Sequence, residues 1–184
     1  MRLNCTKLKS IAKESGATPE TLAGALPRDT DRRKENDESL RKVRNWMRGS
    51  DHPKATARDI EALASALGVP ASRLARFECR TRFARSSPRK ARLVADLVRG
   101  RSVAEADMLL RFSPKRAAVF VRKTLAAATA DAENGGASPD RLFIAESRVD
   151  EGPIIKRFQP KDRGRAHPIQ KKTSHIIIGV EESE

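Results

Sequence analysis

Basic side chains gather in residues 151–178, EGPIIKRFQPKDRGRAHPIQKKTSHIII. From Gly152 to His175 the chain has seven lysines and arginines and one acidic residue, Asp162. Cations spaced along a chain neutralise successive phosphates and release their counterions, which gives strong and salt-sensitive binding. The chemistry that this segment predicts is therefore binding to a nucleic acid, not the making or breaking of bonds.

The segment around these cations, at about residues 150–175, is here named the arm. Two β-prone stretches flank a tip that contains glycine and proline. About ten residues separate Gly152 from Asp162, which corresponds to about 30 Å of extended strand. Few apolar side chains lie in the arm, and an isolated two-stranded ribbon is marginal in water. We therefore predict an arm that is mobile until it docks on its partner.

Further basic clusters lie on a predicted strand and in the first turns of two predicted helices, where free backbone N–H groups also attract anions. They are Arg82 and Arg85, then Arg89, Lys90 and Arg92, and finally Lys115 and Arg116. Any one cluster is more often solvated surface, but together with the arm the clusters favour a polyanionic partner.

Composition points the same way. The chain has 184 residues, a net charge of +14 and a pI of about 10.6, a charge balance typical of nucleic-acid binding. Only 4% of the residues are aromatic and there is no tyrosine. This argues against recognition by base stacking and for recognition through phosphates and RNA shape.

Catalytic and metal-binding patterns are not found in the sequence. There is no GxSxG, P-loop or GxGxxG motif, and His167 and His175 have no cysteine or third histidine nearby. We expect no catalytic residue, metal, cofactor, small-molecule substrate or membrane partner. His175 is expected to hydrogen-bond or stack at the base of the arm, Gly164 to be a turn glycine, and Cys5 and Cys79 to be reduced thiols.

The first half of the sequence predicts only helices. They lie around Leu8 and Ile11, from Thr18-Pro19 to Leu26, around Val43 and Trp46, over 57–67 and in a short turn at 70–74. The charged residues 27–39 predict a loop or a solvated helical extension.

The second half predicts mixed structure. Strands are expected over 77–86, with Cys79, Thr81 and Phe83 alternating with arginines, and over 141–149 and 174–180. One helix begins at Ser87-Pro88, a second at a capping box of Ser102 and Glu105, and a third runs from Ser113-Pro114 to about Glu133. Residues expected to point inward are Leu93, Val94, Leu97 and Val98 in the first helix, and Leu109 and Leu110 in the second. The acidic end, EESE, is expected to be solvated.

Several of these motifs resemble the large-subunit ribosomal protein L twenty-two family. They are SPRKAR at 87–92, VADLVRG at 94–100, SPKRAA at 113–118, DAEN at 131–134, VDEGP at 149–153, Lys156-Arg157, Gly164-Arg165-Ala166 and TSHI at 173–176. The resemblance covers about residues 79–182 in order and without large gaps.

This resemblance implies an α+β fold in which three helices pack on a small three-stranded antiparallel sheet with a long protruding β-hairpin. It implies a structural constituent of the large ribosomal subunit that binds large-subunit rRNA, supports early subunit assembly and lines the nascent-peptide exit tunnel with its hairpin. Implied partners are this rRNA, neighbouring ribosomal proteins and the nascent polypeptide. The implied location is the cytoplasm, on a bacterial-type ribosome, with an organellar ribosome as an open alternative. Asp162 and His167-Pro168 depart from the usual pattern of the tip.

Residues 1–78 resemble a Cro/repressor-type helix-turn-helix domain through WMRG at 46–49, Pro53 and IEALASALGV at 60–69. The charged segment 27–45 departs from that pattern. The division predicted is a helical extension over 1–78 and a ribosomal protein domain over 79–184. A DNA-binding regulator that uses the extension is the alternative function. The residues expected to dock the extension on the ribosome are Arg41, Lys42, Arg44 and Arg48.

The residues expected at the binding site form two overlapping sets. Those expected to bind rRNA are Arg82, Arg85, Arg89, Lys90, Arg92, Lys115, Arg116, Lys156, Arg157, Lys161, Arg163, Gly164, Arg165, His167, Lys171, Lys172, Thr173, Ser174 and His175. Those expected at the exit-tunnel tip are Gln159, Pro160, Lys161, Asp162, Arg163, Gly164 and Arg165.

Overall fold

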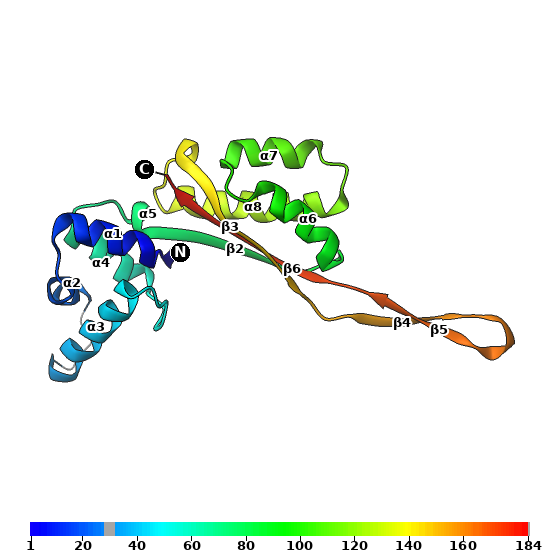
Figure 1. The fold of residues 1–184 in the computed structure, drawn as a ribbon, viewed down its shortest axis with the longest axis horizontal. Coiled ribbons are helices and arrows are strands. Elements are labelled where there is room, and N and C mark those ends of the chain that lie inside the picture. The colour runs from blue at the N-terminus through cyan, green and yellow to red at the C-terminus, as the bar shows by residue number, and fades with distance from the viewer. Residues whose placement is uncertain (28–31, 184) are drawn as a thin grey trace. The chain divides into compact units, whose positions relative to one another are not determined.

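Two β-sheets and eight α-helices make up the fold in the part of the chain that the structure describes (Figure 1). The computed structural model describes the backbone of residues 1–27 and 32–183 and the side chains of 1–27 and 37–183. Four strands form one sheet in the order β1-β2-β6-β3, and β4 and β5 form a second, two-stranded sheet. The combination of helices with antiparallel pairing confirms the predicted α+β class.

The chain divides into two compact units. Unit 1 contains residues 1–77, 131–138 and 181–184, and unit 2 contains residues 78–130 and 139–180. The elements that begin in unit 1 are β1 (Arg2–Leu3), α1 (Cys5–Ser15), α2 (Pro19–Ala25), α3 (Arg32–Met47), α4 (Ala57–Leu67), α5 (Ala71–Leu74) and β2 (Ala75–Ala84). Residues 28–31, part of the segment predicted as a loop or helical extension, lie outside the described residues.

Capping side chains fix the helix ends in unit 1. The Asn4 side chain accepts hydrogen bonds from the backbone N–H groups of the first turn of α1, and Thr18 does the same for α2. Thr56 and Asp59 form a reciprocal capping box at the start of α4. Gly68 ends α4 in the left-handed conformation that glycine adopts without strain. These local signals explain why the predicted helices appear where the sequence places them.

Trp46 is the centre of the core of unit 1. It is fully buried, as are Leu8, Val43 and Leu63. Its indole Nε1 donates a hydrogen bond to the Pro53 carbonyl at 2.6 Å, so the buried ring leaves no polar atom unsatisfied.

The first half is not entirely helical, contrary to the prediction. β1 pairs antiparallel with β2, with Arg2 opposite Arg76 and Leu3 opposite Ala75. A two-residue strand is too short to show the alternation that identifies strands, and Leu3 fits the helical spacing of Leu8 equally well. The sheet consequently has one strand more than predicted.

The prediction of a solvated acidic end is wrong for Glu181, which is only 4% exposed. Glu182 is half-buried, Ser183 is exposed as predicted, and Glu184 lies outside the described residues. The Glu181 carboxylate accepts hydrogen bonds from Asn4 Nδ2 at 2.7 Å and from Arg76 Nε at 2.5 Å, and Lys7 Nζ lies 3.7 Å away. β6 continues to Glu182 and brings this carboxylate among donors that lie more than a hundred residues earlier in the chain. Buried charge is tolerated only with such partners.

Unit 2 contains the remaining elements. They are α6 (Pro88–Val98), α7 (Val103–Phe112), α8 (Arg116–Asn134), η1 (Pro139–Arg141), β3 (Leu142–Glu151), β4 (Ile155–Pro160), η2 (Asp162–Gly164), β5 (Ala166–Lys171) and β6 (Ser174–Glu182), of which α8 and β6 end in unit 1. β6 lies between β2 and β3, and its residues 176–180 are all buried, which is why this strand reads as a continuous apolar run.

α6 packs on β3 with a face that differs from the predicted one. Val94 and Val98 point inward as expected, together with Ala91 and Ala95, but Leu93 is 60% and Leu97 42% exposed. Ser147 Oγ of β3 donates to the Ala95 carbonyl at 2.9 Å, and this close approach needs small side chains in between. In α7, Leu110 is buried as predicted and Leu109 is half-buried.

Replacing Glu181 by glutamine should destabilise unit 1 by about 1.5–3 kcal/mol, because a charged acceptor of two hydrogen bonds is lost in a buried site. Denaturant unfolding followed by the fluorescence of Trp46, the single tryptophan, measures this change. Glu61→Gln, at an exposed position of α4, is the control and should leave the midpoint unchanged. Equal midpoints for the two variants would contradict the anchoring role of Glu181.

Candidate nucleic-acid interface

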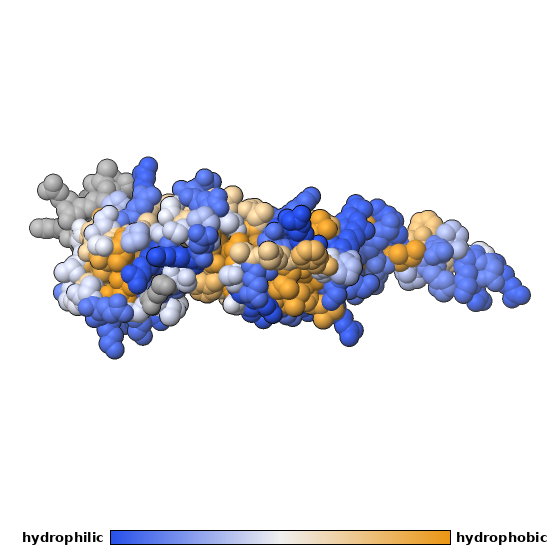
Figure 2. Space-filling view, turned by 90° about the horizontal axis from the view of Figure 1, so that it is seen from above, coloured by the Kyte–Doolittle hydropathy of each residue, from blue (hydrophilic) through white to orange (hydrophobic). Residues whose placement is uncertain are grey.

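The arm is an antiparallel ribbon that projects away from the helices of unit 2 (Figure 1). β4 and β5 pair from Ile155 opposite Lys171 to Pro160 opposite Ala166. Among the residues of these two strands only Ile155 and Ile169 are half-buried, and the others are exposed. Figure 2 shows the arm, at the right, as mostly hydrophilic toward its end. The arm therefore presents its cations on all sides and has no core of its own.

Backbone hydrogen bonds of the residues that flank η2 close the tip. Lys161 N–H donates to the Arg165 carbonyl at 2.8 Å, and Arg165 N–H donates back to the Asp162 carbonyl at 3.3 Å. Gly164 has a φ of +70°, which confirms it as a turn glycine, and Arg163 adopts a φ of +55°. The predicted tip cations Lys161, Arg163 and Arg165 are all exposed.

Gly152 and Thr173 join the two strands of the arm at its base. Gly152 N–H donates to the Thr173 carbonyl at 3.0 Å, and Thr173 Oγ1 donates to the Pro153 carbonyl at 2.7 Å. A Cβ on Gly152 would lie 2.5 Å from Thr173 Oγ1 and 3.2 Å from the Thr173 carbonyl group. Only glycine allows this approach.

His175 interacts with β2 as predicted for the base of the arm. Its Nδ1 accepts a hydrogen bond from Phe83 N–H at 3.1 Å, and the two rings meet edge to face at 4.9 Å and 75°. Phe83 has a φ of +57°, a conformation that costs a residue with a Cβ about 1–2 kcal/mol. The positive φ of Phe83 breaks the predicted alternation of inward and outward side chains in β2. Phe83 is therefore exposed and Ala84 is buried.

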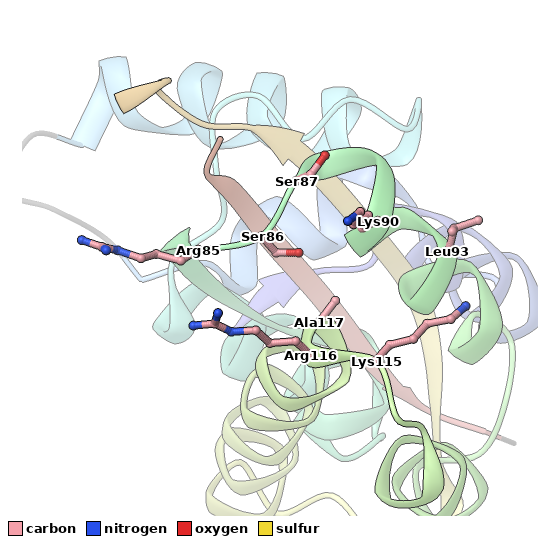
Figure 3. Close-up of a pocket in the computed structure, with 8 residues that line it drawn as sticks. All are labelled: Arg85, Ser86, Ser87, Lys90, Leu93, Lys115, Arg116 and Ala117. Atoms are coloured by element: carbon pink, nitrogen blue, oxygen red, sulfur yellow. The ribbon is translucent and has the colours of Figure 1, made fainter. Parts of the chain in front are cut away.

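Two cavities that share lining residues lie in unit 2, and one of them is lined partly by the arm. The helix cavity, about 460 Å³, is lined by Arg85, Ser86, Ser87, Lys90, Leu93, Lys115, Arg116 and Ala117 (Figure 3). The arm cavity, about 250 Å³, is lined by Arg85, Arg116, Ile155, Lys171, Lys172 and Thr173. Arg85 and Arg116 line both cavities, and their side chains project in the same direction in Figure 3.

The electrostatics of these cavities are one-sided. Six cations line them together, and no carboxylate is among the lining residues. The helix cavity also lies at the starts of α6 and α8, where unpaired backbone N–H groups and the helix dipole favour anions. Ser87, the N-cap of α6, makes no capping hydrogen bond with its side chain. The arrangement suits phosphate groups.

Not every predicted binding residue belongs to this cluster. Arg92 is exposed but its Nε donates to the Val149 carbonyl of β3 at 3.3 Å. Thr173 and Ser174 are buried, and Ser174 Oγ has no hydrogen-bond partner among the described residues. Arg82 and Arg89 are exposed but line neither cavity. The remaining predicted cations and His167 lie along the arm, where they are exposed: Lys156, Arg157, Lys161, Arg163 and Arg165.

In unit 1, the cations predicted to dock the extension lie in α3 and, for Arg48, directly after its end. Arg41, Arg44 and Arg48 are exposed, and their spacing of three and four places them on one face. Lys42 is half-buried and pairs with Glu38 at 3.2 Å.

Metal ligands, a reactive thiol and membrane-spanning helices were also sought in the described part of the chain. It contains no group of three or more His, Cys, Asp or Glu side chains that could hold a metal ion. Burial, and then the charge of Asp51, raise the pKa of the Cys5 thiol, which makes Cys5 a poor nucleophile at neutral pH. No described helix is long and apolar enough to cross a lipid bilayer.

Comparison with known proteins identifies the family of the segment that carries the cationic cluster. The sequence model of the family described as Ribosomal protein L22p/L17e matches residues 79–181. The chain belongs to this family. Residues 1–78 precede the matched segment, whereas the arm and both cavities lie within it.

Individual proteins that resemble this chain carry the name of a large ribosomal subunit protein. The large ribosomal subunit protein uL22 of Syntrophotalea carbinolica is 50% identical over 106 residues, which cover 57% of this chain and 96% of that protein. The protein of the same name from Rubrobacter xylanophilus is 54% identical over 98 residues, 53% of this chain and 77% of the relative. The protein of this name from Geobacter metallireducens is 54% identical over 97 residues, which cover 52% of this chain and 88% of that protein.

Gly152→Ala should loosen the base of the arm and destabilise unit 2 by about 1–3 kcal/mol, because the added methyl group has no room beside Thr173. Amide hydrogen exchange of residues 150–175 measures the loosening. Gly24→Ala is the matched control: it lies in α2 with open space around it and should stabilise the chain by about 0.5–1 kcal/mol. Unchanged exchange at the base in Gly152→Ala would show that the close approach is unimportant.

Proposed function

We propose that the chain is a structural constituent of the large ribosomal subunit and binds large-subunit rRNA through the two cavities and the arm. The observation that carries this proposal is the convergence of six cations on two adjoining cavities at the base of an exposed basic ribbon. Such a surface neutralises several phosphates at once, and membership of a ribosomal protein family supports rRNA as their source.

The arm is proposed to thread into rRNA and to line the nascent-peptide exit tunnel with the residues around η2. Its length and its exposed cations suit burial within a polyanion that surrounds it. Binding that orders such a ribbon early would also support subunit assembly. The relatives named above are bacterial, which supports action on a bacterial-type ribosome in the cytoplasm.

A neighbouring ribosomal protein is proposed to cover part of α7 and α8. Met108, Phe112 and Val119 are exposed there, and Phe112 is 82% exposed. Val119 also lines a cavity of about 370 Å³ with Leu110. Apolar side chains gathered in this way are typical of protein contacts.

Residues 1–78 are proposed to be an extension, joined to the ribosomal domain of residues 79–184, that docks on rRNA or on a neighbouring protein with Arg41, Arg44 and Arg48. All three cations are exposed, two in the last turns of α3 and Arg48 directly after it. The alternative of a DNA-binding regulator gains no support from the family model, which matches residues 79–181.

Replacing Arg85 and Arg116 by glutamine should reduce the salt dependence of rRNA binding. Each lost phosphate contact lowers the slope of log K against log salt by about 0.7–0.9, so the double variant should lose about 1.4–1.8. Filter binding of the full chain to a large-subunit rRNA transcript at several salt concentrations measures the slope. Arg141→Gln, exposed in η1, is the control. A wild-type slope in the double variant would reject the cavities as the binding site.

Replacing residues 159–168 by Asn-Gly should leave unit 2 folded and still bound to rRNA, because the removed residues are almost entirely exposed. Circular dichroism should show an unchanged thermal midpoint. The same binding assay should show weaker but measurable affinity, since Lys161, Arg163 and Arg165 are lost. Melting of the shortened chain at a much lower temperature would contradict the view that the arm adds no core.

A further inference from the structure

Phe83 occupies a position that stability alone does not explain. It is 58% exposed, so its ring adds little to the core. Its φ of +57° lies in the region that glycine and asparagine tolerate and that a bulky aromatic residue avoids. A strained and exposed aromatic side chain in an otherwise regular strand points to a contact outside the chain.

His175 fixes the direction of this ring. Its Nδ1 accepts a hydrogen bond from the Phe83 N–H at 3.1 Å, which holds the imidazole beside the phenyl ring. The edge-to-face contact at 4.9 Å uses the edge of one ring and a face of the other. This geometry orients the phenyl ring before any partner arrives, and a preorganised aromatic surface loses little entropy on binding.

The surroundings of Phe83 are those of a phosphate site. Arg85, two residues after Phe83, lines both cavities, and Thr173, two residues before His175, lines the arm cavity. Arg82, beside Phe83 in sequence, is exposed. A flat aromatic surface next to several cations matches a nucleotide, whose base stacks while its phosphates pair with the cations.

We propose that the Phe83 ring, oriented by His175, stacks on an unpaired base of rRNA whose phosphates occupy the cavities at the base of the arm. This inference rests on the proposed rRNA binding and adds to it a preference for a single-stranded or bulged nucleotide. The low aromatic content of the chain argues against an extended stacking surface, and a single stacking position is compatible with that composition.

The first test separates stacking from charge. In the rRNA filter-binding assay, Phe83→Leu should weaken affinity about 5- to 100-fold at every salt concentration without changing the salt slope, because no phosphate contact is lost. Phe83→Trp and Phe83→Tyr should bind like wild type. Phe112→Leu, which removes a more exposed phenylalanine from α7, should also bind like wild type.

The second test uses the backbone conformation. Phe83→Asn relieves the strain at positive φ, so its thermal midpoint should equal or exceed that of wild type while its rRNA affinity falls. A clear fall in the midpoint would show that Phe83 is structural and would overturn the proposal. In Phe83→Trp, the fluorescence of the new tryptophan should be quenched on adding rRNA, since base stacking quenches indole emission.

Outcomes for the proposal and for the underlying function are distinct. If the wild-type chain fails to bind rRNA, the proposed function itself fails. If wild type binds and Phe83→Leu binds equally well, only the stacking inference fails. An unquenched tryptophan at position 83 also overturns it. A Phe83→Leu chain that binds free rRNA normally but enters ribosomes poorly would assign the ring to a protein neighbour instead.

Discussion

The arm is held together by the hydrogen bonds of its own backbone, with almost no buried side chains, and the functional surface depends on this constraint. Its cations repel one another, so the ribbon gains nothing from them until a polyanion is present. The close contact of Gly152 with Thr173 fixes the base of the arm. Thr173 is buried and comes directly before β6. Thr173 also lines the arm cavity, so backbone geometry and anion-binding chemistry meet at one place.

Local signals in the sequence were sufficient for most of the elements. Thr18 and Ser102 start helices where hydroxyl caps predict them. Thr56 caps the helix that hydrophobic spacing predicts over 57–67, and Gly68 ends it. The inward face of α6 was harder to predict, because its leucines and its small residues both recur at helical spacing. The small residues face inward because β3 lies close to α6. The distance between this helix and this strand is set by tertiary packing, and the local sequence does not indicate it.

The cations of the candidate site could be identified from sequence, but their grouping could not. Arg85 and Arg116 are 31 positions apart, and nothing local indicates that they share two cavities. The same holds for Phe83, whose exposure follows from a positive φ that a strand pattern does not anticipate. Thr173 and Ser174 stand next to cations in the sequence, yet both are buried, and only Thr173 lines a cavity. Residue type indicated the chemistry, whereas long-range packing decided which residues are presented to a partner.

The burial of Glu181 has a consequence for the order in which the chain acquires its structure. Asn4, Lys7 and Arg76 precede the carboxylate that they contact by more than a hundred residues. These contacts of unit 1 therefore form only after residue 181 has been synthesised, whereas residues 1–77 of the same unit are synthesised much earlier.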